Sequence, residues 1–197
     1  MAVMTFLLNF SSMKNSIVIA RMKAFAIDYL IILVYIGLLF AVTLAISSLF
    51  DADLNNIDTL TGELIGFLTL TLPVILYFSF TEAGKYAGSI GKRRFNLKVV
   101  TVTSGKTNLI QNLLRNIIKF LPWEIAHFFV FQFFYFLRTN TEPPNWVLWG
   151  LVTAQGAAII YLLFILFRKD NRSVYELFSS TKVINATNDT FPLSVNQ

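Results

Sequence analysis

Long runs of apolar residues dominate the pattern along the chain. The first run extends from about Ala24 to Phe50 and contains one carboxylate, Asp28. An α-helix rises about 1.5 Å per residue, and the hydrocarbon core of a bilayer is about 30 Å thick. A helix over this run is therefore long enough to cross a membrane.

Two further runs have the same character. The run from about Leu64 to Phe80 contains Pro73. Proline removes a backbone donor, so we expect a kink, which a membrane helix tolerates where neighbours satisfy the freed carbonyl. The run from about Trp146 to Phe167 predicts another span, with tryptophan at an interface position. Its small residues predict close helix packing: Gly150, Ala154, Gly156, Ala157 and Ala158.

A third span is expected between these two, and it has a different pattern. Apolar residues recur at helical spacing over Asn108–Leu121, while Arg115 and Lys119 lie four apart on another face. This predicts an interfacial amphipathic helix that Pro122 ends. The Phe-rich stretch Trp123–Leu137 then predicts a short, tilted span, close to the lower length limit. A fully buried or re-entrant helix is the alternative.

The basic residues support four spans. With an internal N-terminus, all 16 Lys and Arg residues except Arg138 lie on the cytoplasmic side. The first external loop instead contains Asp51, Asp53, Asp58 and Glu63. Positive residues stay inside because their translocation is disfavoured. We therefore expect both termini in the cytoplasm, and the net charge of +5 needs no nucleic acid as its explanation.

Composition agrees with a membrane protein. The chain has 197 residues, of which 55% are hydrophobic and 14% charged, whereas soluble domains have about 25% charged residues. Cysteine is absent, which excludes disulfides and thiolate metal sites. No nucleophile stands beside a base at useful spacing. We therefore expect no enzyme activity, no cofactor and no metal site.

Two short alternating segments, Leu97–Val102 and Thr181–Ile184, predict strands. Both fall on the cytoplasmic side, and pairing would satisfy their backbone groups. The predicted fold is thus an all-α polytopic membrane protein with four transmembrane helices and a small strand pair. We expect one domain over residues 1–184 and a polar, disordered tail over 185–197.

Asp28 is the first candidate for chemistry, because a carboxylate at membrane depth is costly and marks a functional site by default. Arg21 lies seven residues earlier, on the same helix face but about 10 Å away along the axis. Each residue should therefore meet a partner from another segment. The pair either fixes helix packing or takes part in ion or substrate passage.

The segment Ala87–Arg94 is glycine-rich and basic, but it is not a phosphate-binding loop. Tyr86 stands where that motif needs glycine, and Arg93 follows Lys92 where it needs Ser or Thr. We interpret the segment as a glycine turn with a basic cluster beside anionic headgroups. His127, the only histidine, is interpreted as a packed helix residue, with a proton relay as the alternative.

Three separated pieces of the chain carry a family pattern. The first is Arg21–Asp28. The second is Ser89–Arg93, which is followed by Leu97–Val100, by Gly105 and by the Leu114–Asn116 segment that contains Arg115. The third is Ser173–Val183. In their order and spacing these pieces together resemble the RDD family of bacterial membrane proteins.

The resemblance implies a protein of the bacterial inner membrane, with transport as the usual expectation. It places Ser89, Gly91 and Lys92 in a family motif and Glu176, with Arg21 and Asp28, at a candidate ion or proton site. The family expects His-Asp where Tyr175 and Glu176 stand. Glutamate keeps the charge on a longer arm, but tyrosine cannot replace histidine as a proton carrier near neutral pH.

Two functions stay open at this point. One is a small transporter that exchanges a cation or small solute for protons, working as an oligomer because the chain is short. The other is a membrane scaffold or assembly partner that transports nothing. In both cases the expected partners are the bilayer, its anionic cytoplasmic headgroups, and other copies of the chain or other membrane proteins.

Overall fold

The computed structural model describes residues 2–50, 57–168 and 170–186. In chain order the elements are α1 (Ala2–Phe50), α2 (Thr59–Gly66), the π-helix η2 (Phe67–Thr71), α3 (Leu72–Ala83), α4 (Ile90–Arg94), β1 (Leu97–Thr101), α5 (Leu109–Arg138), α6 (Asn145–Phe167), α7 (Val174–Phe178) and β2 (Thr181–Asn185).

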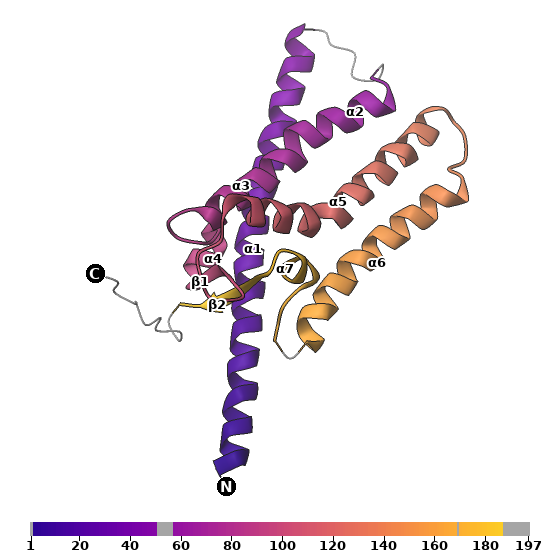
Figure 1. Ribbon diagram of the computed structural model, residues 1–197. Coiled ribbons are helices and arrows are strands. Elements are labelled where there is room, and N and C mark those ends of the chain that lie inside the picture. The colour runs from indigo at the N-terminus through magenta and orange to yellow at the C-terminus, as the bar shows by residue number, and fades with distance from the viewer. Residues whose placement is uncertain (1, 51–56, 169, 187–197) are drawn as a thin grey trace.

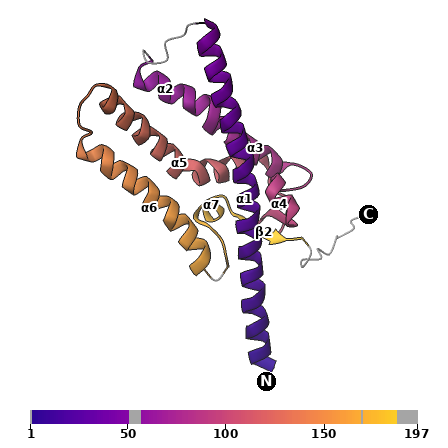
Figure 2. The same cartoon turned by 180° about the vertical axis from the view of Figure 1, so that it is seen from behind.

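Four helical stretches are long and apolar enough to cross a membrane, as the sequence predicted. They are Ile17–Phe50, Thr59–Ala83, Leu109–Arg138 and Asn145–Ile165. The C-terminal end of α1, the start of α2 and the turn from α5 to α6 lie at one end of the molecule (Figures 1 and 2). The short elements α4, α7 and the sheet lie away from that end.

The first helix is much longer than its predicted span. α1 begins at Ala2, not near Ala24. No proline or glycine occurs before Gly37, so nothing in this part of the sequence breaks a helix. Hydropathy located the membrane-crossing part of α1, but the helix continues beyond it.

Pro73 distorts the second span, as expected. The distortion is the π-helix η2, in which the amide of Leu72 donates to the carbonyl of Phe67. Proline at position 73 leaves the carbonyl of Thr69, four residues earlier, without its usual donor. The Tyr35 hydroxyl of α1 donates to that oxygen at 2.5 Å, so a neighbouring helix satisfies the freed carbonyl.

The prediction for the third span was wrong in two respects. Pro122 does not end a helix, because α5 runs through it for 30 residues, and the span is therefore not short. Nor is Asn108–Leu121 a separate interfacial helix. Ile118, four residues before Pro122, loses its amide partner, and its carbonyl accepts a 3.0 Å hydrogen bond from the Tyr161 hydroxyl of α6. This bond lets the helix continue, and the ribbon of α5 bends along its length (Figure 1).

The two predicted strands pair. β1 and β2 are antiparallel, with Val99 opposite Val183 and Val100 opposite Lys182. Asn185, which was expected to begin the tail, is the last residue of β2. The sheet packs on α1, where Leu97, Val99 and Val183 form a small core with Ala24. Residues 187–197 of the predicted tail lie outside the described residues.

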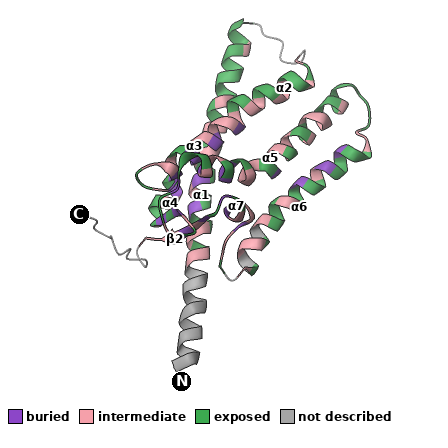
Figure 3. Ribbon diagram, viewed as in Figure 1, coloured by how far each residue is buried: buried purple, intermediate pink, exposed green. Residues whose placement is uncertain are grey.

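The interior near this sheet is polar, while much of the outer surface is apolar. Along α5, Asn112, Arg115 and Asn116 are buried, whereas Ile110 is 78% exposed. Buried positions gather where α1, α3, α4 and α7 approach one another (Figure 3). Lipid solvates apolar side chains, so in a membrane the polar face of an amphipathic helix turns inward.

Close helix packing was predicted from the small residues of α6, and two of them are at closely packed positions. A β-carbon at Gly150 would overlap the ring of Phe129, and Ala154 is buried. Gly156, by contrast, has nothing within 4 Å of such a β-carbon.

Candidate functional site: a buried charge network

A chain of alternating charges runs through the polar interior. Arg21 Nη1 lies 3.0 Å from Glu176 Oε2, and Arg115 Nη1 lies 3.3 Å from Glu176 Oε1. Arg115 Nε lies 3.2 Å from Glu82 Oε2, and Lys92 Nζ lies 2.6 Å from Glu82 Oε1. Both carboxylates are fully buried. The network thus joins α1, α7, α5, α3 and α4.

Arg21 and Glu176 come together because α7 presents its first turn to α1. Ser173 is the N-cap of α7 and forms a capping box with Glu176. Both its amide and its hydroxyl donate to Glu176 Oε2. Arg21 also donates to the carbonyls of Asn171 and Val183. The predicted partner for Arg21 on another segment is therefore Glu176, together with the backbone of its neighbours.

Charge and hydrogen bonding hold Glu176 ionised. Burial by itself raises the pKa of this carboxyl, but the guanidinium groups of Arg21 and Arg115 and the amide of Ser173 outweigh that effect. The pKa of Glu176 therefore lies below its ordinary value.

Arg115 is at the centre of the network, in the stretch that was predicted to be helical. It lies on α5 and is 1% exposed. Besides its ion pairs with both carboxylates, it donates a hydrogen bond to Thr181 Oγ1 at 2.8 Å. Its guanidinium also lies 5.0 Å from the ring centroid of Tyr175. Tyrosine at the position where the family expects histidine thus stacks on the central cation.

Glu82 is the residue that the sequence interpretation missed. The predicted second span ended at Phe80, two residues before it. The signal that could have found it is the polar face of α5, where Asn112, Arg115, Asn116 and Lys119 recur at helical spacing. Such a face needs a polar partner on another helix, and Asn116 Nδ2 indeed donates to Glu82 Oε2 at 3.1 Å.

Asp28 has its own site beside this chain of charges. Its Oδ2 accepts a 2.6 Å hydrogen bond from Ser89 Oγ, and its Oδ1 accepts a 2.8 Å bond from the amide of Gly91. Asp28 is 3% exposed. Its partners are thus on another segment, as predicted. In the described part of the chain none of the ion pairs involves Asp28, so Arg21 does not neutralise it.

The expected glycine turn is a short helix. Ser89 is the N-cap of α4, and Gly91 lies inside that helix. A β-carbon at Gly91 would overlap the carbonyl oxygen of Ala24 and come within 2.8 Å of Asp28 Cγ. Only glycine therefore lets α4 approach α1 closely enough for Asp28 to bind it.

The side chains of the predicted basic cluster differ in whether they face the protein interior or the surface. Lys92 points inward to Glu82, whereas Arg93 is exposed and lies 5.0 Å from the Tyr86 ring. Lys119, on α5, lies 3.6 Å from the ring centroid of Phe78.

His127 is packed among aromatic rings on α5. Its ring centroid lies 4.9 Å from that of Trp123 and 6.5 Å from that of Phe131. Within the described residues, no group of three or more His, Asp or Glu side chains could hold a metal ion.

Four membrane-spanning helices around a polar, charge-paired interior define an integral membrane protein. The sequence matches the model of the RDD family over residues 17–180, which is most of the chain. The chain belongs to the RDD family. A search of curated proteins and a search of solved structures gave no significant match.

Proposed function

We propose that this protein exchanges a small cation or small solute for protons across the membrane. The observation that carries the proposal is the line of ionisable side chains between the second span and α5. Ionisable residues within membrane spans are costly and commonly mark ion or proton pathways. No catalytic step is part of the proposal.

The line begins at the buried network and continues towards the α5–α6 turn. Glu82 of α3 and Lys119 of α5 interact electrostatically at one end. Further along, Glu63 of α2 interacts with Glu124 of α5, and Glu124 interacts with His127. Gly62 and Gly66 of α2 face the ring of Phe131, which brings the two spans close at this level.

Buried oxygens on the same interface suit a passing cation. The Oδ1 atoms of Asn112 and Asn116 are buried and have no hydrogen-bond partner among the described residues. Glu124 Oε2 is likewise buried and has no hydrogen-bond partner among the described residues. A buried acceptor without a donor costs free energy, which a cation or a water molecule entering the interface would recover.

Asp28 is the proposed proton-binding group. Of the buried carboxylates Asp28, Glu82 and Glu176, it alone has no ion pair with another described residue. It can therefore gain a proton without leaving a cation unpaired. α4 links it to the interface, since Ser89 binds Asp28 while Lys92 binds Glu82.

A scaffold function is the second candidate, and the network itself favours it. Each charge from Arg21 to Lys92 is paired, and together they join five elements. A role limited to holding helices together needs nothing more than that. In this case Asp28 serves only to fix α4 against α1.

Flux measurements in proteoliposomes distinguish these functions. We expect Asp28→Asn to retain its melting temperature in detergent and to lose flux of monovalent cations driven by a proton gradient. Asp170→Asn is the matched control, because Asp170 is exposed and pairs with Arg168 outside the network. Unchanged flux in a stable Asp28→Asn protein would exclude the proton role. No flux in the wild type, together with a lower melting temperature in the variant, would favour the scaffold.

The proposal includes a location and an assembly state for the protein. The resemblance to the family implies the inner membrane of a bacterium, and the asymmetry of Lys and Arg supports both termini in the cytoplasm. A chain of this length supports a homo-oligomer or an assembly with other membrane proteins. Basic residues on the cytoplasmic side suit anionic headgroups.

A further inference from the structure

The segment between the second span and α5 carries unbalanced positive charge. Residues 84–106 contain no Asp or Glu and six basic residues: Lys85, Lys92, Arg93, Arg94, Lys98 and Lys106. Among the described ion pairs, only Lys92 of this set meets a carboxylate. The other five are exposed. These five positive charges are therefore available to an anionic partner outside the protein.

The two faces of α4 make different contacts. Its inner side supplies the amide of Gly91 to Asp28 and the ammonium of Lys92 to Glu82. Its outer side exposes Ile90, Arg93 and Arg94. A ligand on the outer side would thus touch the same short helix that holds the buried network.

Tyr86 lies in the turn that follows the second span, close to two of these cations. It is 57% exposed. The Arg93 guanidinium lies 5.0 Å from the ring centroid and the Lys85 ammonium 6.0 Å. An exposed tyrosine beside Lys and Arg where a span ends is typical of the headgroup level of a bilayer.

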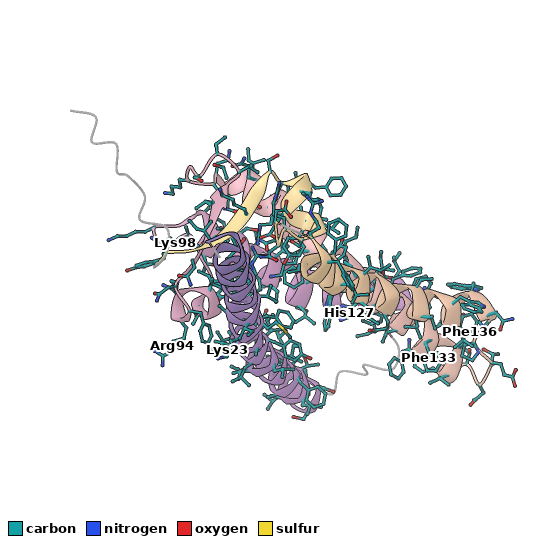
Figure 4. All side chains as sticks on the ribbon, turned by 90° about the horizontal axis from the view of Figure 1, so that it is seen from below. Lys23, Arg94, Lys98, His127, Phe133 and Phe136 are labelled. Atoms are coloured by element: carbon teal, nitrogen blue, oxygen red, sulfur yellow. The ribbon has the colours of Figure 1, made fainter. Side chains whose placement is uncertain are left out.

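The surroundings of α4 identify a membrane as the partner. Arg94, Lys98 and Lys23 lie on one flank of the molecule, seen along α1 (Figure 4). On α1, Met22 and Phe25 next to Lys23 are exposed apolar side chains. A nucleic acid or a soluble acidic protein would not cover apolar residues of a membrane-spanning helix, whereas a phospholipid presents its acyl chains and its phosphate together.

We propose that the outer face of α4 and the preceding turn bind the headgroup of an anionic phospholipid. Lys85, Arg93 and Arg94 contact the phosphate, and Tyr86 lies at the headgroup level. Binding there fixes α4, and so stabilises the contacts of Asp28 and Glu82. This inference does not depend on transport, because its test measures lipid binding and not flux.

The test measures the affinity of the full chain in neutral detergent for a fluorescent phosphatidylglycerol. Each basic residue near a charged headgroup changes affinity about fivefold, so Arg93→Gln combined with Arg94→Gln should lose about 30-fold. Lys106→Gln combined with Lys182→Gln is the matched control. Both of these residues border Val100 in the sheet, and the variant loses the same net charge. It should retain the affinity of the wild type.

A second readout uses nanodiscs. The wild type should melt at a higher temperature in mixed phosphatidylcholine and phosphatidylglycerol than in phosphatidylcholine alone, and the Arg93/Arg94 variant should show no such difference. If that variant does not fold in neutral lipid, Lys85→Gln replaces it, since Lys85 lies outside α4, and about a fivefold loss is expected.

Three results would overturn the proposal. Equal losses in the test and control variants would mean general attraction between charges. Displacement of the labelled lipid by inorganic phosphate as effectively as by unlabelled phosphatidylglycerol would indicate a soluble anion as the ligand. Unchanged affinity in Lys85→Gln and in the Arg93/Arg94 variant would remove the site altogether.

Discussion

Single residues in this protein are explained by the partners that they meet. Arg21 and Asp28 lie on one helix, yet they serve separate sites, with Glu176 at one and Ser89 with Gly91 at the other. Glu176 has the longer side chain at a position where the family expects Asp, and it reaches two arginines. Glutamate therefore keeps the charge and forms two ion pairs in this chain.

Glu176 makes stability depend on pH. Its pKa is below the ordinary value of 4.5, so its contribution is complete above about pH 5 and is lost as the pH falls below 4.5 through the folded-state pKa. At neutral pH, Glu176→Gln removes the ion pair of Arg21 and one of the two ion pairs of Arg115, and it should lower the free energy of unfolding by about 3 to 5 kcal/mol. Thermal melts in detergent across this pH range measure both effects.

Two variants make that measurement specific. Glu176→Asp, the residue that the family expects, should lose less stability than Glu176→Gln. Asp170→Asn, which alters an exposed ion pair, should change stability by no more than about 0.5 kcal/mol. Equal melting temperatures for Glu176→Gln and the wild type at neutral pH would contradict the assigned role.

At the scale of elements, the two prolines inside membrane spans are accommodated in the same way. Pro73 frees the carbonyl of Thr69, and Pro122 frees that of Ile118. A tyrosine hydroxyl from a neighbouring helix, Tyr35 or Tyr161, donates to each oxygen. Helix distortion is therefore coupled to helix packing, because each hydrogen bond also ties two spans together.

This coupling can be measured with a double-mutant cycle. Tyr161→Phe should destabilise the protein by about 1 kcal/mol, since interhelical hydrogen bonds in membranes contribute about 0.6 to 1.7 kcal/mol. In a Pro122→Ala background the new amide bonds to Ile118, so the same change should cost much less. Tyr135→Phe removes an exposed hydroxyl and serves as the control. An equal cost of Tyr161→Phe in both backgrounds would show that the bond does not compensate for proline.

At the scale of the whole molecule, the distribution of basic residues agrees with the arrangement of the helices. Seven of the 16 Lys and Arg residues lie on α4, the sheet and the start of α5. These elements gather around α1, away from the α5–α6 turn (Figures 1 and 2). This arrangement separates the basic end of the molecule from the turn that contains Asn140.

Topology can be tested by labelling single cysteines in intact cells, since the chain has no cysteine of its own. A membrane-impermeant maleimide should modify cysteines placed at Asp53 and Asn140. It should spare those at Lys106 and Asn188, because both lie on the predicted cytoplasmic side. Permeabilised cells, in which all four must react, are the control. Modification of the Asn188 probe in intact cells would refute the four-span topology.

The sequence by itself determined that there are four spans, that two strands pair, and that Arg21 and Asp28 need partners elsewhere. These features depend on local properties: apolar length sets what lipid accepts, alternation predicts strands, and seven residues of helix separate two side chains by a known distance. A local pattern is sufficient because the membrane supplies the same solvent to every residue of a span.

Only the tertiary structure decided which face of α5 is buried, that α5 continues through Pro122, and that Glu82 joins the network. Each of these depends on a group from a distant segment: Glu82 for the polar face of α5, and the Tyr161 hydroxyl for the carbonyl that proline frees. A buried charge or carbonyl is stable only when its partner is in place. Helix packing places that partner, and the hydropathy of the sequence does not indicate which helices contact each other.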